Sequence, residues 1–212
     1  MFFSYFCLFA CSISVADAIE PKINDSTIRP EVKKTALHSY QHAIQQDLTD
    51  TSIVTIIDLE LSSTKKRLWV IDVKTGKTLF YEQVAHGRNS DTDNDTFVDK
   101  GGLSNERKSK KSSIGVYLTA ETYHSSKFKG TSLKLDGLEK EFNDNARKRA
   151  IVMHPANYAD VKEGQRVGRS HGCPALDPDI SDSLIDTIKD GTLLIQYYPD
   201  EQWLKKSDFV NK

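Results

Sequence analysis

The sequence predicts a mainly β domain with flanking helices, an α+β fold. From residue 51 onward most apolar residues alternate with polar ones or form short runs, which is the pattern of strands. Helical spacing of apolar residues is confined to two segments, residues 25–50 and 178–189. With 212 residues the chain is long enough for one well-filled domain and short for two.

The N-terminal segment has the composition of a secretory signal. Residues 1–16 carry no charged side chain, and small residues follow at Ala16 and Ala18, so we predict a signal peptide over residues 1–18. The segment lacks the usual leading Lys or Arg, and a lipoprotein box at residues 8–11 is the alternative. After cleavage, Cys173 would be the single cysteine. Neither this stretch nor any later one is long and uncharged enough to span a bilayer comfortably.

A helical extension is expected over residues 19–50. Apolar residues recur at threes and fours within residues 25–50, and Asp25 or Ser26 is available as the N-cap. His38 and His42 stand at i and i+4, a spacing that can ligate a metal, but no third ligand accompanies them. We therefore expect solvated histidines on a helix that packs against the main domain, residues 51–212.

Strands and one further helix fill that domain. A hairpin turn is predicted at residues 74–77, Lys-Thr-Gly-Lys, between two of the strands. The helix over residues 178–189 begins at Pro178 and is ended by Asp190-Gly191. Beyond residue 199 the tail is polar, and Trp203 and Leu204 should dock it onto the domain. The predicted strands are residues 53–61, 67–73, 78–85, 114–123, 131–138, 149–154 and 192–198.

A long polar stretch, residues 86–113, interrupts the strands, and such loops in compact domains are usually functional or mobile. Its acidic residues alternate as in a calcium loop but lack the Gly and terminal Glu, so we expect a solvated acidic loop over residues 91–99. The basic run at residues 107–111 is expected to be a solvated surface; the alternative is a substrate-facing flap that meets an anionic glycan peptide.

A cysteine and a histidine form the candidate reactive pair. The Ser, His, Gly and Pro residues around Cys173 do not build an apolar core, which argues against an inert buried thiol. An unassisted thiol with a pKa of about 8.5 is mostly protonated near neutrality, so attack on a carbonyl needs a base. His154, at the end of an apolar run, would supply imidazole as that base.

The loop around Cys173 is predicted to stabilise an oxyanion. Gly172 before the cysteine and Pro174 after it allow a tight turn, in which the amides of Gly172 and Cys173 could point toward one spot. Convergent N–H groups there would bind the negative oxygen of a tetrahedral intermediate. Arg169 adds positive potential that favours the thiolate and could hold an anionic substrate.

These residues resemble the signature of the L,D-transpeptidases, the YkuD-type enzymes that cross-link bacterial peptidoglycan. The resemblance is closest to the murein L,D-transpeptidase subgroup, in which Gly-Arg-Ser-x-Gly-Cys-x-Ala follows a His-x-x-x-Tyr strand end, here His154 to Tyr158. It implies a β-sandwich or barrel-like mixed sheet with the cysteine at one end. Further matching segments, between about residues 80 and 198, are His86-Gly87, Leu103-Ser104-Asn105 and residues 112–117 and 132–138.

The resemblance also implies a reaction and a location. An exported enzyme of the bacterial periplasm or cell envelope would attack an L,D-peptide bond of a donor stem with Cys173, release D-alanine and pass the acyl group to an amine of an acceptor stem. His171 would position the loop by hydrogen bonding, and Tyr158, Arg169 and Ser170 would orient the pair or bind the stem. No cofactor or metal is needed.

Three alternatives stay open. Water in place of the acceptor amine would give an L,D-carboxypeptidase with the same pair. A non-catalytic peptidoglycan-binding module is the second, and its one hint is Ala175, where many members of the wider family carry Arg or Asn. A metal-dependent murein hydrolase using His86, His154 and His171 is the third, although no ligand pair has zincin-like spacing. The net charge of −1 predicts no whole-molecule attraction to nucleic acid or anionic membrane.

Overall fold

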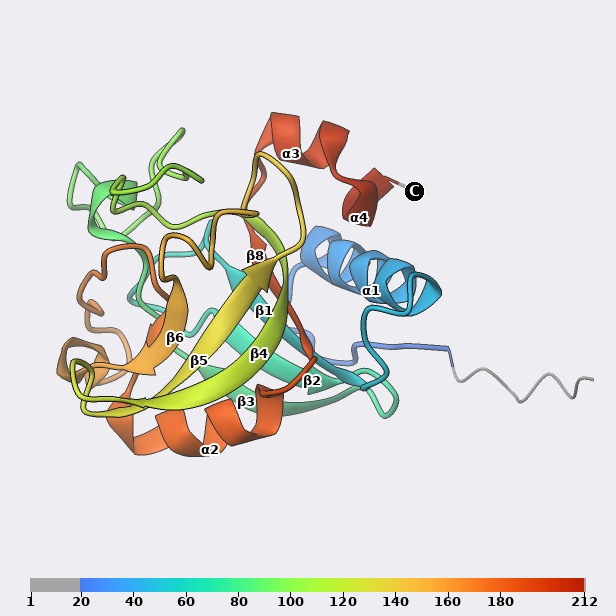
Figure 1. Ribbon diagram of the computed structural model, residues 1–212, viewed down its shortest axis with the longest axis horizontal. Helices are drawn as coiled ribbons and strands as arrows, with labels where there is room; N and C mark the ends of the chain where they lie inside the picture. The colour runs from blue at the N-terminus through green and yellow to red at the C-terminus, as the bar shows by residue number, and fades with distance from the viewer. Residues whose placement is uncertain (1–19, 212) are drawn as a thin grey trace, which may run out of the picture.

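One mixed sheet of eight strands, in the order β3-β2-β1-β8-β4-β5-β6-β7, forms the centre of the molecule (Figure 1). The computed structural model describes residues 20–211. β1 and β8 are parallel, as are β6 and β7, and the other neighbours are antiparallel. The prediction of a mixed sheet with flanking helices is confirmed. The strands are β1 (Ile53–Asp58), β2 (Leu68–Asp72), β3 (Lys77–Glu82), β4 (Gly115–Ser125), β5 (Gly130–Gly137), β6 (Val152–Pro155), β7 (Ala175–Leu176) and β8 (Leu193–Tyr197).

Both faces of the sheet are covered, because successive side chains of a strand point to opposite sides. In β2, Leu68 and Val70 enter one apolar core, whereas Trp69 and Ile71 enter the other. Helix α2 (Pro178–Ile188) contributes Leu184 to the first core, and helix α1 (Pro30–Gln45) packs its buried side into the second (Figure 1). The central strands are therefore apolar in continuous runs rather than alternating with polar residues.

Helix α1 is shorter than the predicted residues 25–50. Pro30 stands in its first turn, where a missing N–H is tolerated, and Arg29 precedes it without a side-chain cap. Asp25 instead accepts hydrogen bonds from Thr27 and Thr78, so it closes a turn and ties it to β3. After Gln46 the chain turns at Asp47, whose φ of 53° ends the helix.

The predicted docking of the tail is confirmed. Two short helices, α3 (Glu201–Lys206) and α4 (Asp208–Asn211), follow β8 and cover the same face as α1. Trp203 is fully buried, and its indole N–H donates to the buried carboxylate of Glu139. Glu139 also accepts from the Val116 amide of β4, so the tail is hydrogen-bonded to the connector after β5 and through it to the sheet.

The predicted strands are present with ends shifted by a few residues, and one strand was missed. β7 has only two residues and lies directly after Cys173, too short to show any periodicity in the sequence. The short 3₁₀ helices η1 (Arg88–Ser90) and η2 (Asn157–Ala159) lie in the loops beside it. No helix within residues 20–211 is long and apolar enough to cross a membrane. The predicted signal peptide, residues 1–18, lies outside the described residues.

Candidate active site

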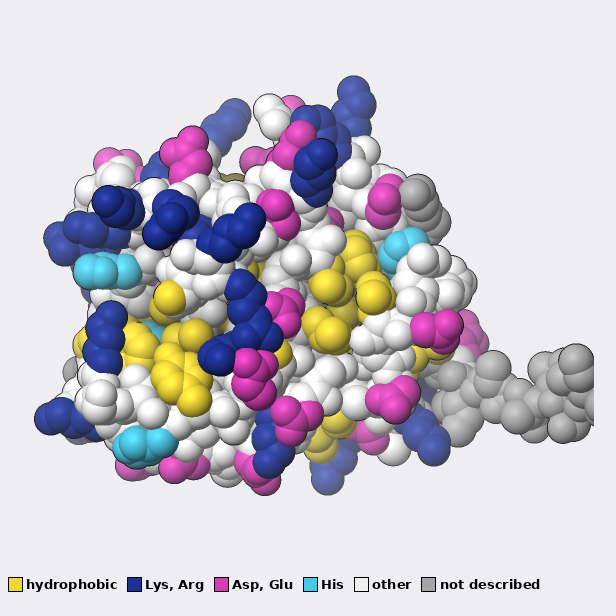
Figure 2. Space-filling view, viewed as in Figure 1, with side chains coloured by type: hydrophobic (Ala, Val, Ile, Leu, Met, Phe, Trp, Pro, Cys, Tyr) yellow, Lys and Arg dark blue, Asp and Glu magenta, His cyan; other side chains and the backbone are white. Residues whose placement is uncertain are grey.

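A cavity of about 500 Å³ opens beside β6 and holds both members of the candidate pair. Its walls come from segments far apart in the sequence: the polar loop before β4, the β4–β5 turn, the connector before β6 and the loop that carries Cys173. Figure 2 shows Lys and Arg side chains gathered on the left of the face in view, over the loops that Figure 1 places beside β6. The lining residues are Arg107, Lys108, Lys110, Lys127, Phe128, Lys148, Arg149, Ala150, Ile151, His154, Tyr158, Arg169, Ser170, His171 and Cys173.

His154 is presented by β6 as a neutral base. Its ring stacks on Phe128 with centroids 3.6 Å apart, and its Nδ1 lies 2.8 Å from the carbonyl oxygen of Pro155. A carbonyl can only accept, so Nδ1 carries the proton and Nε2 keeps a lone pair. Burial lowers the pKa of the imidazole, and the positive charge of Lys127 lowers it further. The hydrogen bond to Pro155 acts in the opposite direction and raises the pKa. The imidazole is therefore neutral, with Nε2 able to accept a proton at neutral pH.

Cys173 is buried at the cavity wall, with 8% of its surface exposed. Its thiol donates to the carbonyl oxygen of Ala150 at 3.7 Å. Burial raises the pKa of the Cys173 thiol, and the Val152 amide and the charges of Lys127 and Arg149 counteract the rise. The resting sulfur is thus a protonated thiol that needs a base to react.

Cys173 and His154 are placed together by the parallel pairing of β6 and β7. His154 pairs with Ala175, and the His154 amide donates to the Pro174 carbonyl at 3.3 Å. Both side chains line the same cavity. Within residues 20–211 no hydrogen bond joins the two, because the thiol is directed to Ala150 and the Nδ1–H of the imidazole to Pro155. The resting state therefore holds the pair as neighbours, each bonded to a main-chain carbonyl.

Ser170 shapes the loop before the cysteine. Its hydroxyl donates to the Cys173 carbonyl at 2.6 Å and accepts from the Gly172 amide at 3.0 Å. The expected role of Gly172 as an oxyanion donor is not supported, because its N–H is held by Ser170 and the residue does not line the cavity. Gly172 serves by its conformation instead: its φ is +120°, and an added Cβ would lie 2.6 Å from the Lys111 carbonyl oxygen.

The other predicted site residues also lie at the cavity. His171 is exposed on its wall, and Tyr158, 39% exposed, covers the loop at Gly168. Burial raises the pKa of Tyr158 to about 12. Arg169 lines the cavity while its guanidinium donates to the Asp91 carbonyl at 2.6 Å, so part of its hydrogen-bonding capacity supports the polar loop.

Arg149 is a residue that the sequence analysis missed. Its guanidinium donates to the carbonyls of Ser104 and Lys111, each at 2.6 Å, and to the hydroxyls of Ser113 and Ser109. These four bonds fix the chain from Ser104 to Ser113 beside Cys173, and the positive charge lowers the pKa of the thiol. The sequence shows that Arg149 precedes the His154 strand, and this was the available signal. It does not show the partners of Arg149, which the fold brings from the distant segment Ser104 to Ser113.

The prediction of a solvated acidic loop is wrong for Asp91. This carboxylate is fully buried and accepts from the Arg166 guanidinium at 2.9 Å and from the Asp95 amide at 3.0 Å. Asp93 and Asp95 are exposed, as expected. Asp91 therefore anchors the loop from inside, because a buried carboxylate is stable only when charged or N–H donors surround it.

His86 does not join His154 and His171 at the cavity. It is buried, its Nδ1 accepts from the Arg67 guanidinium at 2.8 Å, and burial with the nearby arginines lowers its pKa to about 3. The three histidines of the metal-hydrolase alternative therefore do not converge. Within residues 20–211 no group of three or more His, Cys, Asp or Glu side chains is arranged to hold a metal ion.

No curated protein matches the chain. The solved structures that match include an L,D-transpeptidase from Mycobacterium smegmatis, at 12% identity with a TM-score of 0.43, covering 69% of this chain and 59% of that one. A structure from Bdellovibrio bacteriovorus matches at 17% identity with a TM-score of 0.44, covering 70% of this chain and 50% of that one. L,D-transpeptidase 1 of Mycobacterium tuberculosis matches at 13% identity with a TM-score of 0.39, covering 68% of this chain and 61% of that one.

The chain thus spans 59% and 50% of the first two of these proteins. The family described as L,D-transpeptidase catalytic domain, YkuD_2, matches residues 24–197, which include α1, all eight strands and the loop that carries Cys173. The chain belongs to the L,D-transpeptidase catalytic domain family.

Proposed function

We propose that the protein is an exported cysteine acyltransferase that acts on peptidoglycan stem peptides as an L,D-transpeptidase. The observation that supports this most directly is the placement of Cys173 and His154 on one cavity wall by the β6–β7 pair, with the lone pair of His154 on Nε2. A thiol beside a neutral imidazole is the arrangement that acyl transfer through a thioester requires. We assign residues 51–212 to the catalytic domain and residues 19–50 to its extension.

In the first half-reaction, the Cys173 thiol leaves the Ala150 carbonyl and gives its proton to Nε2 of His154. The sulfur attacks the carbonyl carbon of the L,D-peptide bond and a C–S bond forms. The C–N bond then breaks, the departing amine of D-alanine takes the proton from the imidazolium, and a thioester remains.

In the second half-reaction, an amine of the acceptor stem attacks the thioester carbonyl. His154 takes a proton from this amine, the C–S bond breaks, and the thiolate is protonated again. Pro155 holds the imidazole in the required tautomer through both steps. The Cys173 amide, next to the sulfur and with no acceptor among residues 20–211, is the available donor for the oxyanion.

Export completes the proposal, because the stem peptides lie outside the cytoplasm. A signal peptide over residues 1–18 would bring the catalytic domain to the periplasm or cell envelope. N-terminal sequencing of protein recovered from the envelope fraction tests it: a start near residue 19 is expected, and a start at Met1 in the cytoplasmic fraction would refute it.

The reaction is tested with purified tetrapeptide muropeptides. Wild-type protein should give cross-linked dimers and D-alanine, and Cys173→Ala should give neither. Tripeptide as the sole product would assign the protein as an L,D-carboxypeptidase. Mass spectrometry after incubation with a carbapenem should place an adduct on Cys173, and a folded protein with no adduct would favour a non-catalytic wall-binding module. Activity should be unchanged by a chelator and lost after alkylation.

A further inference from the structure

The cavity around Cys173 carries positive charge, most of which is not neutralised by any carboxylate among residues 20–211. Seven of its fifteen lining residues are Lys or Arg, and none is Asp or Glu. Within residues 20–211, six of these cations form no ion pair with an acidic side chain. One is the half-buried Arg149, which binds carbonyls and hydroxyls instead. The other five are exposed, and they are Arg107, Lys108, Lys110, Lys127 and Lys148.

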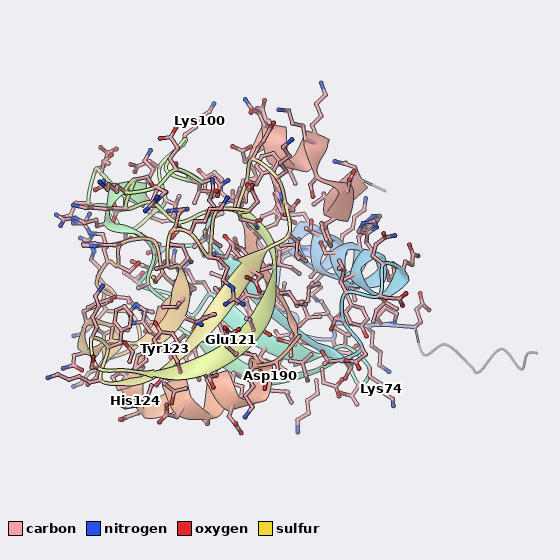
Figure 3. The ribbon with its side chains drawn as sticks, in the orientation of Figure 1. Lys74, Lys100, Glu121, Tyr123, His124 and Asp190 are labelled. Atoms are coloured by element: carbon pink, nitrogen blue, oxygen red, sulfur yellow. The ribbon has the colours of Figure 1, made fainter. Side chains whose placement is uncertain are left out.

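A neighbouring arginine shows the contrast. Arg147, one residue before Lys148, is paired with Asp136 and with Glu121, which Figure 3 labels on β4. A cation of this region can therefore be neutralised by carboxylates, whereas the five exposed cations of the cavity have no such partner among residues 20–211.

The segment that supplies three of these cations is held in place. We call residues 104–113 the basic flap. Arg149 fixes its main chain at Ser104 and Lys111, and Asn89 bonds its carbonyls at Ser109 and Lys110. The flap charges are thus carried by an ordered backbone rather than by a freely moving loop.

Two lysines of the basic flap adopt a backbone conformation that is unfavourable for them. The φ angles are +64° at Lys108 and +57° at Lys110, in the left-handed region that favours glycine. Backbone strain of this kind is concentrated at functional sites. Both lysines line the cavity, so the strained conformation is found where the positive charge is displayed.

The β4–β5 turn brings a further cation to the pair itself. Lys127 Nζ lies 4.9 Å from the centre of the Phe128 ring, and that ring stacks on His154. A negative group on a substrate that reaches Cys173 would therefore meet Lys127 on one side and the basic flap on another. The cavity volume of about 500 Å³ suits a short peptide.

We propose that the basic flap and Lys127 select donor stem peptides by their free side carboxylates, in preference to stems in which these carboxylates are amides. The inference rests on the proposed function and adds its substrate class. Ala175 agrees with it: this buried residue of β7 cannot offer a charge, so the cations of the cavity wall take over recognition of the stem.

Binding of two matched probes tests the proposal without turnover. The probes are the N-acetylated stem tetrapeptide with free carboxylates on its second and third residues, and the same peptide with both as amides. The full-length chain with Cys173→Ala is titrated with each by calorimetry. We expect the free-carboxylate stem to bind about tenfold more tightly, because each partly exposed ion pair contributes modestly. The difference should shrink as ionic strength rises from about 0.1 M to about 1 M.

Charge-neutralising variants identify the residues. Lys108→Gln with Lys110→Gln, and separately Lys127→Gln, should weaken binding of the free-carboxylate stem and leave the amidated stem unchanged. Lys74→Gln is the matched control, since Lys74 is an exposed lysine of the β2–β3 turn on the side of the molecule away from β6 (Figure 3). It should change neither affinity.

The outcomes separate this inference from the proposed function. Equal binding of both stems, or an equal loss for both in the flap variants, would overturn the selectivity even if wild-type protein cross-links both stems. Binding of neither stem, together with no turnover by wild-type protein, would overturn the selectivity and the transpeptidase assignment at once.

Discussion

Replacing Gly172 by alanine should disable the nucleophile while leaving the fold intact. The added Cβ would lie 2.6 Å from the Lys111 carbonyl oxygen, whereas such a contact is normally at least about 3.3 Å. Neither atom can yield easily, because the Lys111 carbonyl accepts from Arg149 and the Gly172 amide donates to Ser170. The loop must therefore shift by a good part of an ångström directly beside Cys173.

The size of the effect follows from that shift and from the backbone angle. A displacement of about 1 Å at a reacting group lowers the rate about 100-fold, so we expect a loss of about 10- to 100-fold in carbapenem acylation. A non-glycine residue at a φ of +120° adds backbone strain. Strain of about 2 kcal/mol would lower the melting temperature by about 4–8 °C in a domain of this size.

Gly191→Ala is the matched control. Its φ of +97° also favours glycine, but nothing lies within 4 Å of an added Cβ. It should lower the melting temperature and leave the acylation rate unchanged. Mass spectrometry of the adduct over time gives the rate, and thermal unfolding gives the stability. Wild-type acylation by Gly172→Ala, or an equal rate loss in Gly191→Ala, would refute the reasoning.

Three further predictions concern titration and buried carboxylates. The acylation rate should rise with pH through and above the neutral range, because burial raises the pKa of Cys173; Lys127→Gln removes a charge that lowers this pKa and should move the measured profile to higher pH. Asp91→Ala should lower the free energy of unfolding in urea by about 3 kcal/mol, because it removes a buried ion-pair partner, whereas the exposed Asp93→Ala should change it by less than about 0.5 kcal/mol. Glu139→Gln should cost about 1–3 kcal/mol in the same measurement, because the tail loses hydrogen bonds, without changing the acylation rate; equal loss of rate and stability would contradict this.

Much of the fold could be predicted because the spacing of apolar residues along the chain indicates which side chains are buried. The runs that became β1, β2 and β8 are largely apolar on both faces, and α2 has its cap and stop residues in the chain. β7 could not be predicted, since two residues carry no period and its place is fixed by pairing with β6. The start of α1 was missed because Asp25 looked like a cap while its actual partners, Thr27 and Thr78, include one from a distant strand.

The part of the candidate site that depends on residue chemistry and on the sequence motif could be predicted. Cys173 and His154 were expected at one site, and both line the same cavity. The contacts that surround them depend on chain segments far apart in sequence: Phe128 reaches His154 through the β4–β5 turn, and Arg149 reaches the basic flap. The Gly172 amide could donate either to the nearby Ser170 hydroxyl or to an oxyanion. In the structure it donates to Ser170, and residue types alone do not decide between these two roles.

The parallel pairing of β6 and β7 has a consequence for how such proteins can diversify. The chain between them leaves after Pro155 and returns at Ala175, and bonds at its base, from Ala156 to Leu176 and from His154 to Pro174, close it off from the sheet. Residues 160–165 at its outer end, before the Arg166 that pairs with Asp91, are mostly exposed. This outer portion can be exchanged or lengthened while the sulfur and the imidazole keep their relative placement, so new substrate preferences can evolve there without rebuilding the reactive centre.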